Sequence, residues 1–495
     1  MTTAIALLLV LYSLIVIGIG YVAHRRAKAA TEEDYFVASR TFGLVVLFLT
    51  YEATLYSMWF FTGTGGFWYK HGVGFLCHVL WLTAGGMMLY WIGTRLWLAG
   101  KRWGFVTPGD LLAHRYGSEA VRVTAAVVGI GFVFPYVLLQ IVGAGRLLHA
   151  ALDLPLWAGG GLMMLVVITY TLLGGGRAVA WTDAFQGFFF LTLIWAIAIW
   201  SVAVLAGGWE PLWSRMAAQM PDRLTLPGPQ GTFTFSYWFS FWAVLSVSIS
   251  MPGIWMRVYS AKGPASLRRT AALVPLGAVV AYLATLLYAF SAAPHFPGLA
   301  GTEPDQLLPT MLREFGPGWM LPVVVAAFAA GMSTADSQLL AVSAMVTSDV
   351  YKRYVRQGAS QGHLVWVGRA FVVAFTALAW LVASFVELPL LVNLGLMAYA
   401  GTANLFVPLV GALFWRRATA AGALSGIAAG VATLLLLDPK TSPLFASAPL
   451  PLHPGFAGLV VNAAVFTAVS LATPHAGGEQ HEAYRRLFRR AYRRT

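Results

Sequence analysis

Small, hydroxyl and acidic residues follow one another at positions 330–337, in the order Ala-Gly-Met-Ser-Thr-Ala-Asp-Ser, inside an apolar run. Ser333 and Thr334 supply adjacent hydroxyls, Asp336 supplies a carboxylate, and the small residues let neighbouring helices approach closely. Polar groups at this depth in lipid are unfavourable, so they usually line a pathway or a site. The alternative is a structural role, in which each hydroxyl bonds a carbonyl one turn earlier. Paired hydroxyls followed by an acid favour the pathway or site.

Two other apolar segments are interrupted by polar residues, glycine or proline. The first covers residues 50–66, and the second covers residues 246–253, which end in Pro252-Gly253. Proline removes a backbone donor and glycine relaxes a helix, so we expect breaks there. A broken helix exposes carbonyls near the middle of the membrane, where they can ligate a cation. Two interrupted spans, five apart in order, indicate an inverted-repeat transporter with a ten-helix core.

Two further acids lie where they could bind a proton or a cation. Glu52 is well inside a predicted span, where an acid serves by default as a proton carrier, cation ligand or counter-ion. It could instead be a neutral, hydrogen-bonded residue that packs between helices. Asp183 follows a glycine-rich turn, and it either caps a helix or faces the core and holds a cation or an ion pair. The turn lacks the Gly-Lys-Ser/Thr ending of a phosphate loop.

The composition requires an all-α integral membrane protein. Of the 495 residues, 59% are hydrophobic and 10% are charged, against about 25% charged residues in soluble domains. The single cysteine, Cys77, excludes intrachain disulfides. The sequence has no His-Glu-x-x-His, Gly-x-Ser-x-Gly or phosphate-loop motif, so we expect no enzyme activity and no organic cofactor.

Apolar runs of about 20 residues predict thirteen membrane spans. Their approximate limits are 4–23, 42–68, 73–98, 120–150, 154–174, 179–207, 235–259, 270–292, 319–347, 364–386, 388–415, 419–437 and 454–473. The predicted division is an N-terminal extra helix and inner loop (1–40), a first repeat (41–233), a second repeat (234–418), and two extra helices with a basic tail (419–495).

The net charge of +13 comes from short basic clusters between these spans. Of the 32 lysines and arginines, 26 fall in alternate loops, which we expect to face the cytoplasm. This pattern predicts an N-terminus outside the cell and a C-terminus in the cytoplasm. The predicted location is the plasma (inner) membrane. The tail at 484–494 pairs arginines with aromatic residues. We expect a helix on the anionic inner leaflet there, in preference to an RNA-binding segment. The expected partners are the lipid bilayer and a small organic solute, with no nucleic acid and no obligatory protein partner.

Two long motifs give the chain a family resemblance. The run from Gly174 to Gln186 and the run from Ala330 to Ser337 resemble the sodium/solute symporter family. The resemblance covers nearly the whole chain and implies a leucine-transporter-type fold of two inverted five-helix repeats that works by alternating access. It also implies a Na+ site between spans two and nine. Matched position by position, that site uses the carbonyls of Ala53, Tyr56 and Ala330 and the hydroxyls of Ser333 and Thr334.

Some relatives of this kind bind a second cation. The corresponding candidates for a second cation or proton site are Ser57, Asp183, Glu52 and Asp336. Phe60 stands where those relatives carry a hydroxyl, and Leu55 stands where the proline-transporting branch carries an aspartate. The acid of this chain lies three positions earlier, at Glu52. A proton can therefore replace or accompany Na+.

The solute is expected between the two broken spans, with spans four and eleven as walls. The candidate contacts are Thr54, Ser57, Trp59, Gln140, Trp242, Ser246, Tyr399 and Asn404. The expected function is a secondary active symporter that uses Na+ to take up a small organic acid, such as a monocarboxylate, or an amino acid. The alternatives are a proton-coupled symporter that uses Glu52 and a transporter-like solute sensor. About 20 residues follow the last span, too few for an output domain, which disfavours the sensor.

Overall fold

A computed structural model of the protein describes residues 2–26, 31–301, 303–386, 391–438, 451–474 and 478–492. Helices make up almost all of this part of the chain, and no strand occurs in it. The α-helices up to residue 219 are α1 (Thr2–Arg25), α2 (Glu32–Val37), α3 (Leu44–Leu55), α4 (Met58–His71), α5 (Leu76–Trp103), α6 (Pro108–Tyr116), α7 (Glu119–Leu152), α8 (Leu156–Trp200) and α9 (Trp209–Gln219).

The α-helices beyond residue 219 continue the bundle. They are α10 (Phe235–Ser246), α11 (Pro252–Ser260), α12 (Pro264–Ala292), α13 (Leu307–Phe315), α14 (Met320–Ala344), α15 (Gln361–Phe385), α16 (Leu391–Thr402), α17 (Phe406–Phe414), α18 (Ala420–Leu437), α19 (Pro454–Ala472) and α20 (Gly478–Tyr492). A π-helical segment, η9 (Met345–Val355), prolongs α14.

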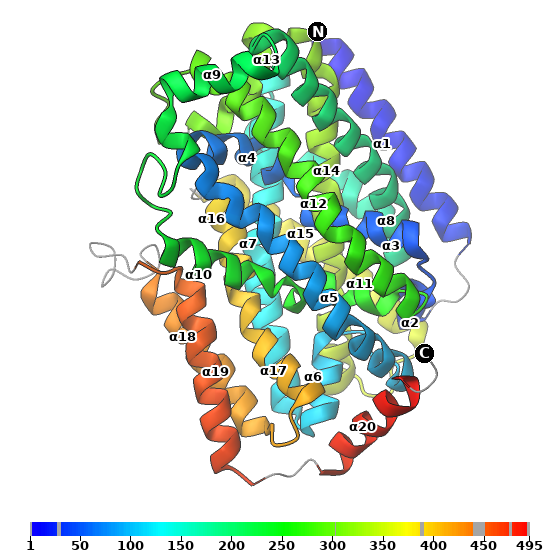
Figure 1. The fold of residues 1–495 in the computed structure, drawn as a ribbon. Coiled ribbons are helices and arrows are strands. Elements are labelled where there is room, and N and C mark those ends of the chain that lie inside the picture. Colours follow the sequence, from blue (N-terminus) through cyan, green and yellow to red (C-terminus); the bar gives the residue numbers. More distant parts are fainter. Residues whose placement is uncertain are drawn as a thin grey trace.

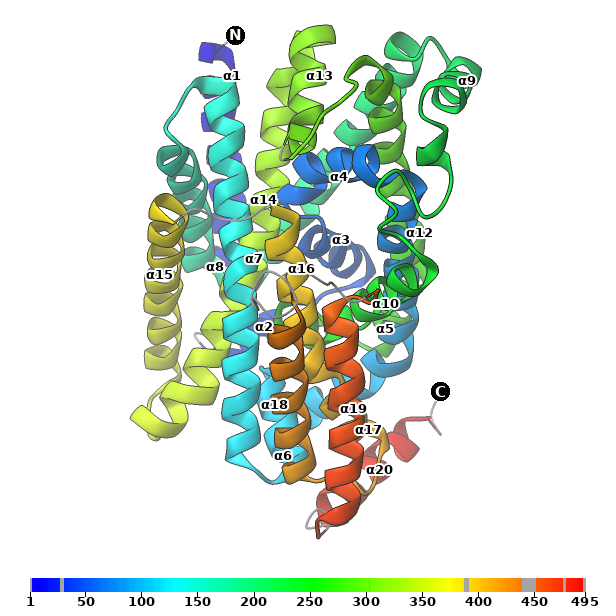
Figure 2. The same cartoon turned by 90° about the vertical axis from the view of Figure 1, so that its left-hand side faces the viewer.

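The long helices run between two ends of the molecule, as Figure 1 shows. The N-terminus lies at the same end as α9 and α13, and α6 and α20 lie at the opposite end (Figure 1). Helix α14 is central, since every residue from Val323 to Ala344 is buried. Helices α18 and α19 pack against each other at the side of the bundle, in the half nearer α20 (Figure 2). Helix α14 contacts α3, α7 and α8, and its small residues permit their close approach.

Both predicted helix breaks are present. Helix α3 ends at Leu55, Tyr56 and Ser57 have extended backbone, and α4 begins at Met58. The amide oxygen of Gln140 on α7 accepts a hydrogen bond from the N–H of Met58 at 2.8 Å, which satisfies one free donor at the start of α4. The second break separates α10 from α11, whose axes differ by 46°, and Pro252 begins α11. The regular helical hydrogen-bond pattern is therefore interrupted inside the bundle at two places.

Thirteen spans are not confirmed. Ten helices of the described residues are long and apolar enough to cross a membrane, and the number is eleven if α10 with α11 is one span. One reason is that α8 and the π-helical segment η3 (Ser201–Leu205) after it form a single run of 50 residues, which extends over two of the predicted spans and contains a kink between two helices. Its only interruption is Gly175 (φ 54°, ψ −143°), which lies against the carbonyl of Tyr35, so a larger residue would clash there.

The amphipathic helix predicted for the tail is present as α20. Its buried residues include Tyr484 and Phe488, one turn apart, whereas Arg485, Arg486 and Arg489 are exposed. Four residues of the charge count, Lys28, Lys440, Arg493 and Arg494, lie outside the described residues. The orientation of the chain in the membrane stays a prediction.

Candidate cation and solute sites

Five neutral oxygens meet where the break between α3 and α4 faces α14. The hydroxyl of Ser333 lies 3.1 Å from the carbonyl oxygens of both Ala53 and Ala330. The hydroxyl of Thr334 lies 3.4 Å from the Ala53 carbonyl and 3.3 Å from the Tyr56 carbonyl. Because Tyr56 has left the helix, its carbonyl and that of Ala53 lack the usual helical partners and turn toward α14. The structure thus brings all five predicted Na+ ligands together.

This cluster has the chemistry of a site for a hard monovalent cation. A cation at its centre would replace the two hydroxyl hydrogens as the partner of the carbonyls, and each hydroxyl oxygen would become a ligand. Oxygen ligands without a thiol or an imidazole suit such an ion. All five residues are buried, so the cation would exchange its water for these oxygens.

Two carboxylates and one guanidinium lie beside this cluster. Asp183 of α8 accepts a hydrogen bond from Arg257 of α11 at 3.0 Å and another from Thr50 of α3. Asp336 of α14 accepts one from the hydroxyl of Tyr170. Within the described residues, one carboxylate oxygen of each aspartate has no hydrogen-bond partner. Burial makes two carboxylates against one guanidinium unfavourable unless a proton or a second cation balances the charge.

Glu52 has separate surroundings. It is 1% exposed, and one of its oxygens accepts a hydrogen bond from the hydroxyl of Tyr56, one turn along the chain. The carboxylate lies against Gly277 of α12. No hydrogen bond joins it to Asp183, Asp336 or Ser57 in the part of the chain that is described. The four candidates for a second site therefore do not form one cluster. Asp183 and Asp336 both lie near Arg257, whereas Glu52 lies apart from them.

A small cavity lies beside the α3–α4 break. It is lined by Leu55, Ser57, Trp59, His78, Trp81, Tyr136, Leu139, Tyr282, Gly395, Leu396 and Tyr399. Its volume of about 20 Å³ gives room for the centre of about one water molecule. A solute can therefore occupy it only after the surrounding side chains or helices move apart. The lining contains no lysine, arginine, aspartate or glutamate.

Three of the eight predicted solute contacts, Ser57, Trp59 and Tyr399, line this cavity. The other five do not line this cavity and have other partners in this structure, so their role as solute contacts stays a prediction. Gln140 bonds Met58 at the helix break, and Thr54 lies 3.1 Å from Ser337. The indole of Trp242 bonds the Leu80 carbonyl, and the Ser246 hydroxyl bonds the Trp242 carbonyl. Asn404 pairs with Asn462 of α19.

His78 and Trp81 of α5 and Tyr282 of α12 are cavity residues that the sequence analysis missed. The imidazole of His78 lies 2.9 Å from the hydroxyl of Tyr282 through Nε2. Its Nδ1 and the indole nitrogens of Trp59 and Trp81 are buried without a hydrogen-bond partner among the described residues. A histidine just inside an apolar helix was a signal in the sequence, because a buried imidazole needs a polar partner.

The end of the bundle that holds α6 is closed by ion pairs. Arg122 at the start of α7 bonds Asp110 of α6 at 2.6 Å and Asp349 of η9 at 3.0 Å. Asp349 is fully buried and also accepts a hydrogen bond from Thr107 at 2.8 Å. These contacts join α6, α7 and the extension of α14, so this end must separate before the cavity can open toward it.

A bundle with two broken helices, an oxygen cluster at one break and an adjoining cavity defines a secondary transporter of the leucine-transporter fold. A solved structure of this fold, a Na+-coupled sialic acid symporter in a substrate-bound outward-open state, superimposes with a TM-score of 0.81 over 95% of this chain and 98% of that one, at 16% identity.

The chain belongs to the sodium:solute symporter family, whose model matches residues 35–430. It is 27% identical to the sodium/pantothenate symporter of Haemophilus influenzae over 90% of this chain and 92% of that protein. It is 28% identical to the sodium/proline symporter of the same organism, over 81% and 82%. Both relatives are symporters by name, and the chain spans most of each.

Proposed function

We propose that this protein couples inward flow of Na+ to uptake of a small organic acid by alternating access. The observation that carries the proposal is the cluster of five oxygens between the α3–α4 break and α14. An ion bound there joins a broken helix to the central helix, so it fixes the backbone that also lines the solute cavity at Ser57. The cation thereby completes the solute site.

Coupling requires that the two states of the carrier bind Na+ with different affinity. The ion pairs of Arg122 hold the α6 end closed in the present state. In the proposed cycle, Na+ and solute bind from the other end, and the α6 end then opens to release both. The distribution of basic loops predicts that the α6 end faces the cytoplasm. The membrane is then the plasma membrane. We propose residues 41–233 and 234–418 as the two inverted repeats of the carrier.

The cavity favours an organic acid over an amino acid. An ammonium group would need a carboxylate or several free acceptors, and the described lining has no acidic side chain. A carboxylate, in contrast, would find the unpartnered N–H groups of Trp59 and Trp81 together with the imidazole of His78. Neutral donors suit an anion that enters together with a cation, because the pair adds no net charge to the site.

Uptake into proteoliposomes tests this function. With labelled monocarboxylates, pantothenate and proline supplied outside, we expect an inward Na+ gradient to drive accumulation of a carboxylate that lacks an amine, and a K+ gradient to drive none. His78→Ala should raise the KM of that solute about tenfold, because a hydrogen bond to a charged group is lost. Preferential uptake of proline would contradict the proposed solute class.

A proton-coupled carrier is the second candidate, and the buried carboxylate of Glu52 with one oxygen lacking a partner among the described residues favours it. An inward proton gradient without Na+ would then drive uptake, and Glu52→Gln would abolish this coupling. Na+-driven uptake that persists in Glu52→Gln would show that Na+, and not a proton on Glu52, is the coupling ion.

A further inference from the structure

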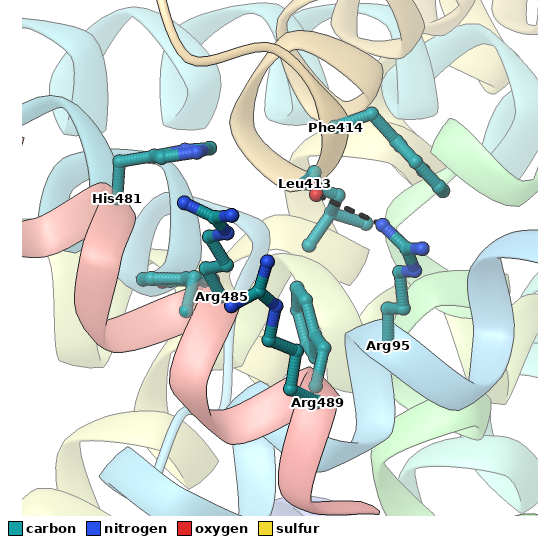
Figure 3. Close-up of a pocket in the computed structure, with 8 residues that line it drawn as sticks. Arg95, Leu413, Phe414, His481, Arg485 and Arg489 are labelled. Carbon is teal, nitrogen blue, oxygen red and sulfur yellow. Dashed lines mark hydrogen bonds between the residues drawn. The ribbon is translucent and has the colours of Figure 1, made fainter. Parts of the chain in front are cut away.

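A basic groove lies between α20 and the ends of α5 and α17. Its lining residues are Arg95, Leu413, Phe414, His481, Tyr484, Arg485, Phe488 and Arg489. Its volume is about 720 Å³, far larger than the solute cavity. Figure 3 shows Arg485 and Arg489 on one side, from α20, and Arg95 on the other, from α5. The described lining contains three guanidinium groups and no carboxylate.

The arginines of this groove are held in different ways. Arg95 donates a hydrogen bond to the Leu413 carbonyl at 3.3 Å and lies over the ring of Phe414 at 4.1 Å. Its guanidinium is therefore fixed in place by backbone and ring. Arg485 has a distant neighbour in Glu482, 3.7 Å away on the same helix, and both side chains are well exposed. Such an exposed pair is weak and leaves most of the charge of Arg485 available.

Helix α20 itself is anchored, so the groove has a fixed shape. Its Tyr484 stacks on Trp103 of α5 with ring centroids 4.5 Å apart, and its hydroxyl lies 3.2 Å from Nδ1 of His114 on α6. Tyr484 is 1% exposed and Phe488 is 6% exposed. Burial of these aromatic rings holds the arginines of α20 opposite Arg95.

The groove borders an apolar surface of α5. Phe414 stacks on Trp91, with ring centroids 4.5 Å apart, and Trp91 is 48% exposed. Along the same helix, Tyr90 is 59% exposed and Met87 is 66% exposed. These residues belong to a helix that is long and apolar enough to span the membrane. A ligand that fills the groove and this surface has an anionic head and hydrocarbon chains.

We propose that the groove binds the phosphodiester headgroup of an anionic glycerophospholipid, with Arg95, Arg485 and Arg489 around the phosphate and the acyl chains along Trp91 and Met87. Guanidinium groups bind phosphate oxygens through two parallel hydrogen bonds, which suits this role. A free phosphate would use the arginines and leave the adjoining apolar surface unused. Basic pockets beside membrane helices are a known setting for anionic lipid headgroups.

Binding of a short-chain phosphatidylglycerol to the purified full-length protein in detergent tests this proposal, with thermal stability as the readout. We expect a saturable rise in melting temperature with phosphatidylglycerol, and none with phosphatidylcholine of the same chain length or with inorganic phosphate. Arg485→Gln and Arg489→Gln should each weaken the apparent affinity about tenfold, since each removes a charged hydrogen bond to phosphate. Both residues are exposed, so the melting temperature without lipid should not change.

Arg486→Gln is the matched control. Arg486 lies on the same helix, is 69% exposed and lines a different groove with Glu482 and Arg102. Its substitution removes the same charge and should leave the affinity within about twofold. Equal loss in Arg486→Gln would show general attraction to charge and overturn the site. An equal effect of phosphatidylcholine, saturation by inorganic phosphate, or binding of a short RNA that Arg489→Gln abolishes would overturn it too. None of these outcomes depends on transport activity.

Discussion

Arg257 is the residue on which the buried acids of the core depend. It is 3% exposed in its side chain and pairs with Asp183, which has no exposed surface, and it also donates to Ser337 of α14. A buried ion pair gives little net stability, but removal of one partner leaves an uncompensated charge. The stability of the fold around Arg257 and Asp183 therefore depends on the presence of both opposite charges.

This balance gives a prediction for Arg257→Gln. We expect the substitution to lower the free energy of unfolding by about 3–5 kcal/mol, because the carboxylate of Asp183 stays buried without its partner. The double variant with Asp183→Asn should recover more than half of that loss. Denaturation in detergent, followed by tryptophan fluorescence, measures both. A double variant that is as unstable as the sum of the two single variants would show that the two residues do not act as a pair.

Asp305 supplies a pH dependence outside the spanning helices. It lies in the short helix η7 (Glu303–Gln306), and burial raises the pKa of its carboxyl to about 6, with Lys70 and Arg146 opposing that rise. The folded protein therefore holds a proton that the unfolded chain has already lost between about pH 4 and pH 6. Stability from this residue is complete below about pH 4 and is lost as the pH rises through 6.

We expect Asp305→Asn to flatten that part of the stability profile. The wild-type protein should lose up to about 3 kcal/mol from this carboxyl between pH 4 and pH 7, and the variant should not. Melting temperatures over this pH range, with Asp222→Asn as a control at an aspartate whose side chain is 54% exposed, measure the effect. If the melting temperature of Asp305→Asn falls with pH as steeply as that of the wild type, groups other than Asp305 cause the pH dependence.

At the residue scale, the residues predicted for the cation site lie together, whereas those predicted for the solute site do not all line one cavity. Ser333 and Thr334 lie in a long motif, and the structure places both against the carbonyls that the resemblance implied. His78 and Tyr282 come from helices α5 and α12, and their convergence depends on how those helices pack. Local sequence does not contain that information. Asn404 and Trp242 were chosen for their polarity and their place in a span, and each points to another helix or carbonyl.

At the scale of elements, the broken helix α3–α4 is the feature that makes both sites. Its break is held open from outside, since the side chain of Gln140 on α7 replaces the missing helical acceptor for Met58. Gln140 was predicted as a solute contact, and its position explains why a polar residue is present in an apolar helix. Polar residues and glycines predicted the first break, and Pro252-Gly253 predicted the second. The partner that stabilises a break was not predictable.

Gln140→Leu tests this role. We expect a loss of stability of about 1 kcal/mol, the usual effect of losing a helix cap, and a weaker Na+ response because the carbonyls of Ala53 and Tyr56 lose their fixed position. The control Thr192→Val removes an exposed hydroxyl of α8 that bonds a carbonyl of its own helix. Thermal stability measured with and without NaCl separates the two effects. A normal Na+ midpoint in Gln140→Leu would show that the break keeps its shape without the cap.

At the scale of the whole molecule, the sequence predicted the fold and the family, and the predicted number of thirteen spans is not confirmed. In α8, the helical backbone is interrupted at Gly175, between the two spans that the apolar pattern predicted there. The two ends of the molecule differ in a way that matters for transport. The α6 end is closed by Arg122, Asp110 and Asp349, and the cavity is too small for a solute. Transport therefore requires movement of whole helices.

The measurement that tests the central claim most directly is the Na+ dependence of thermal stability in the purified protein. NaCl replaces choline chloride at constant ionic strength, and KCl is the control. A ligand that binds only the folded state at ten times its Kd stabilises it by about 1.4 kcal/mol. We predict a saturable shift with Na+ alone, its loss in Ser333→Ala, and its persistence in Ser343→Ala, which removes an equally buried hydroxyl of α14 that bonds the Gly368 carbonyl. A wild-type protein without a Na+-specific shift, or an unchanged shift in Ser333→Ala, would contradict the cation site between α3, α4 and α14.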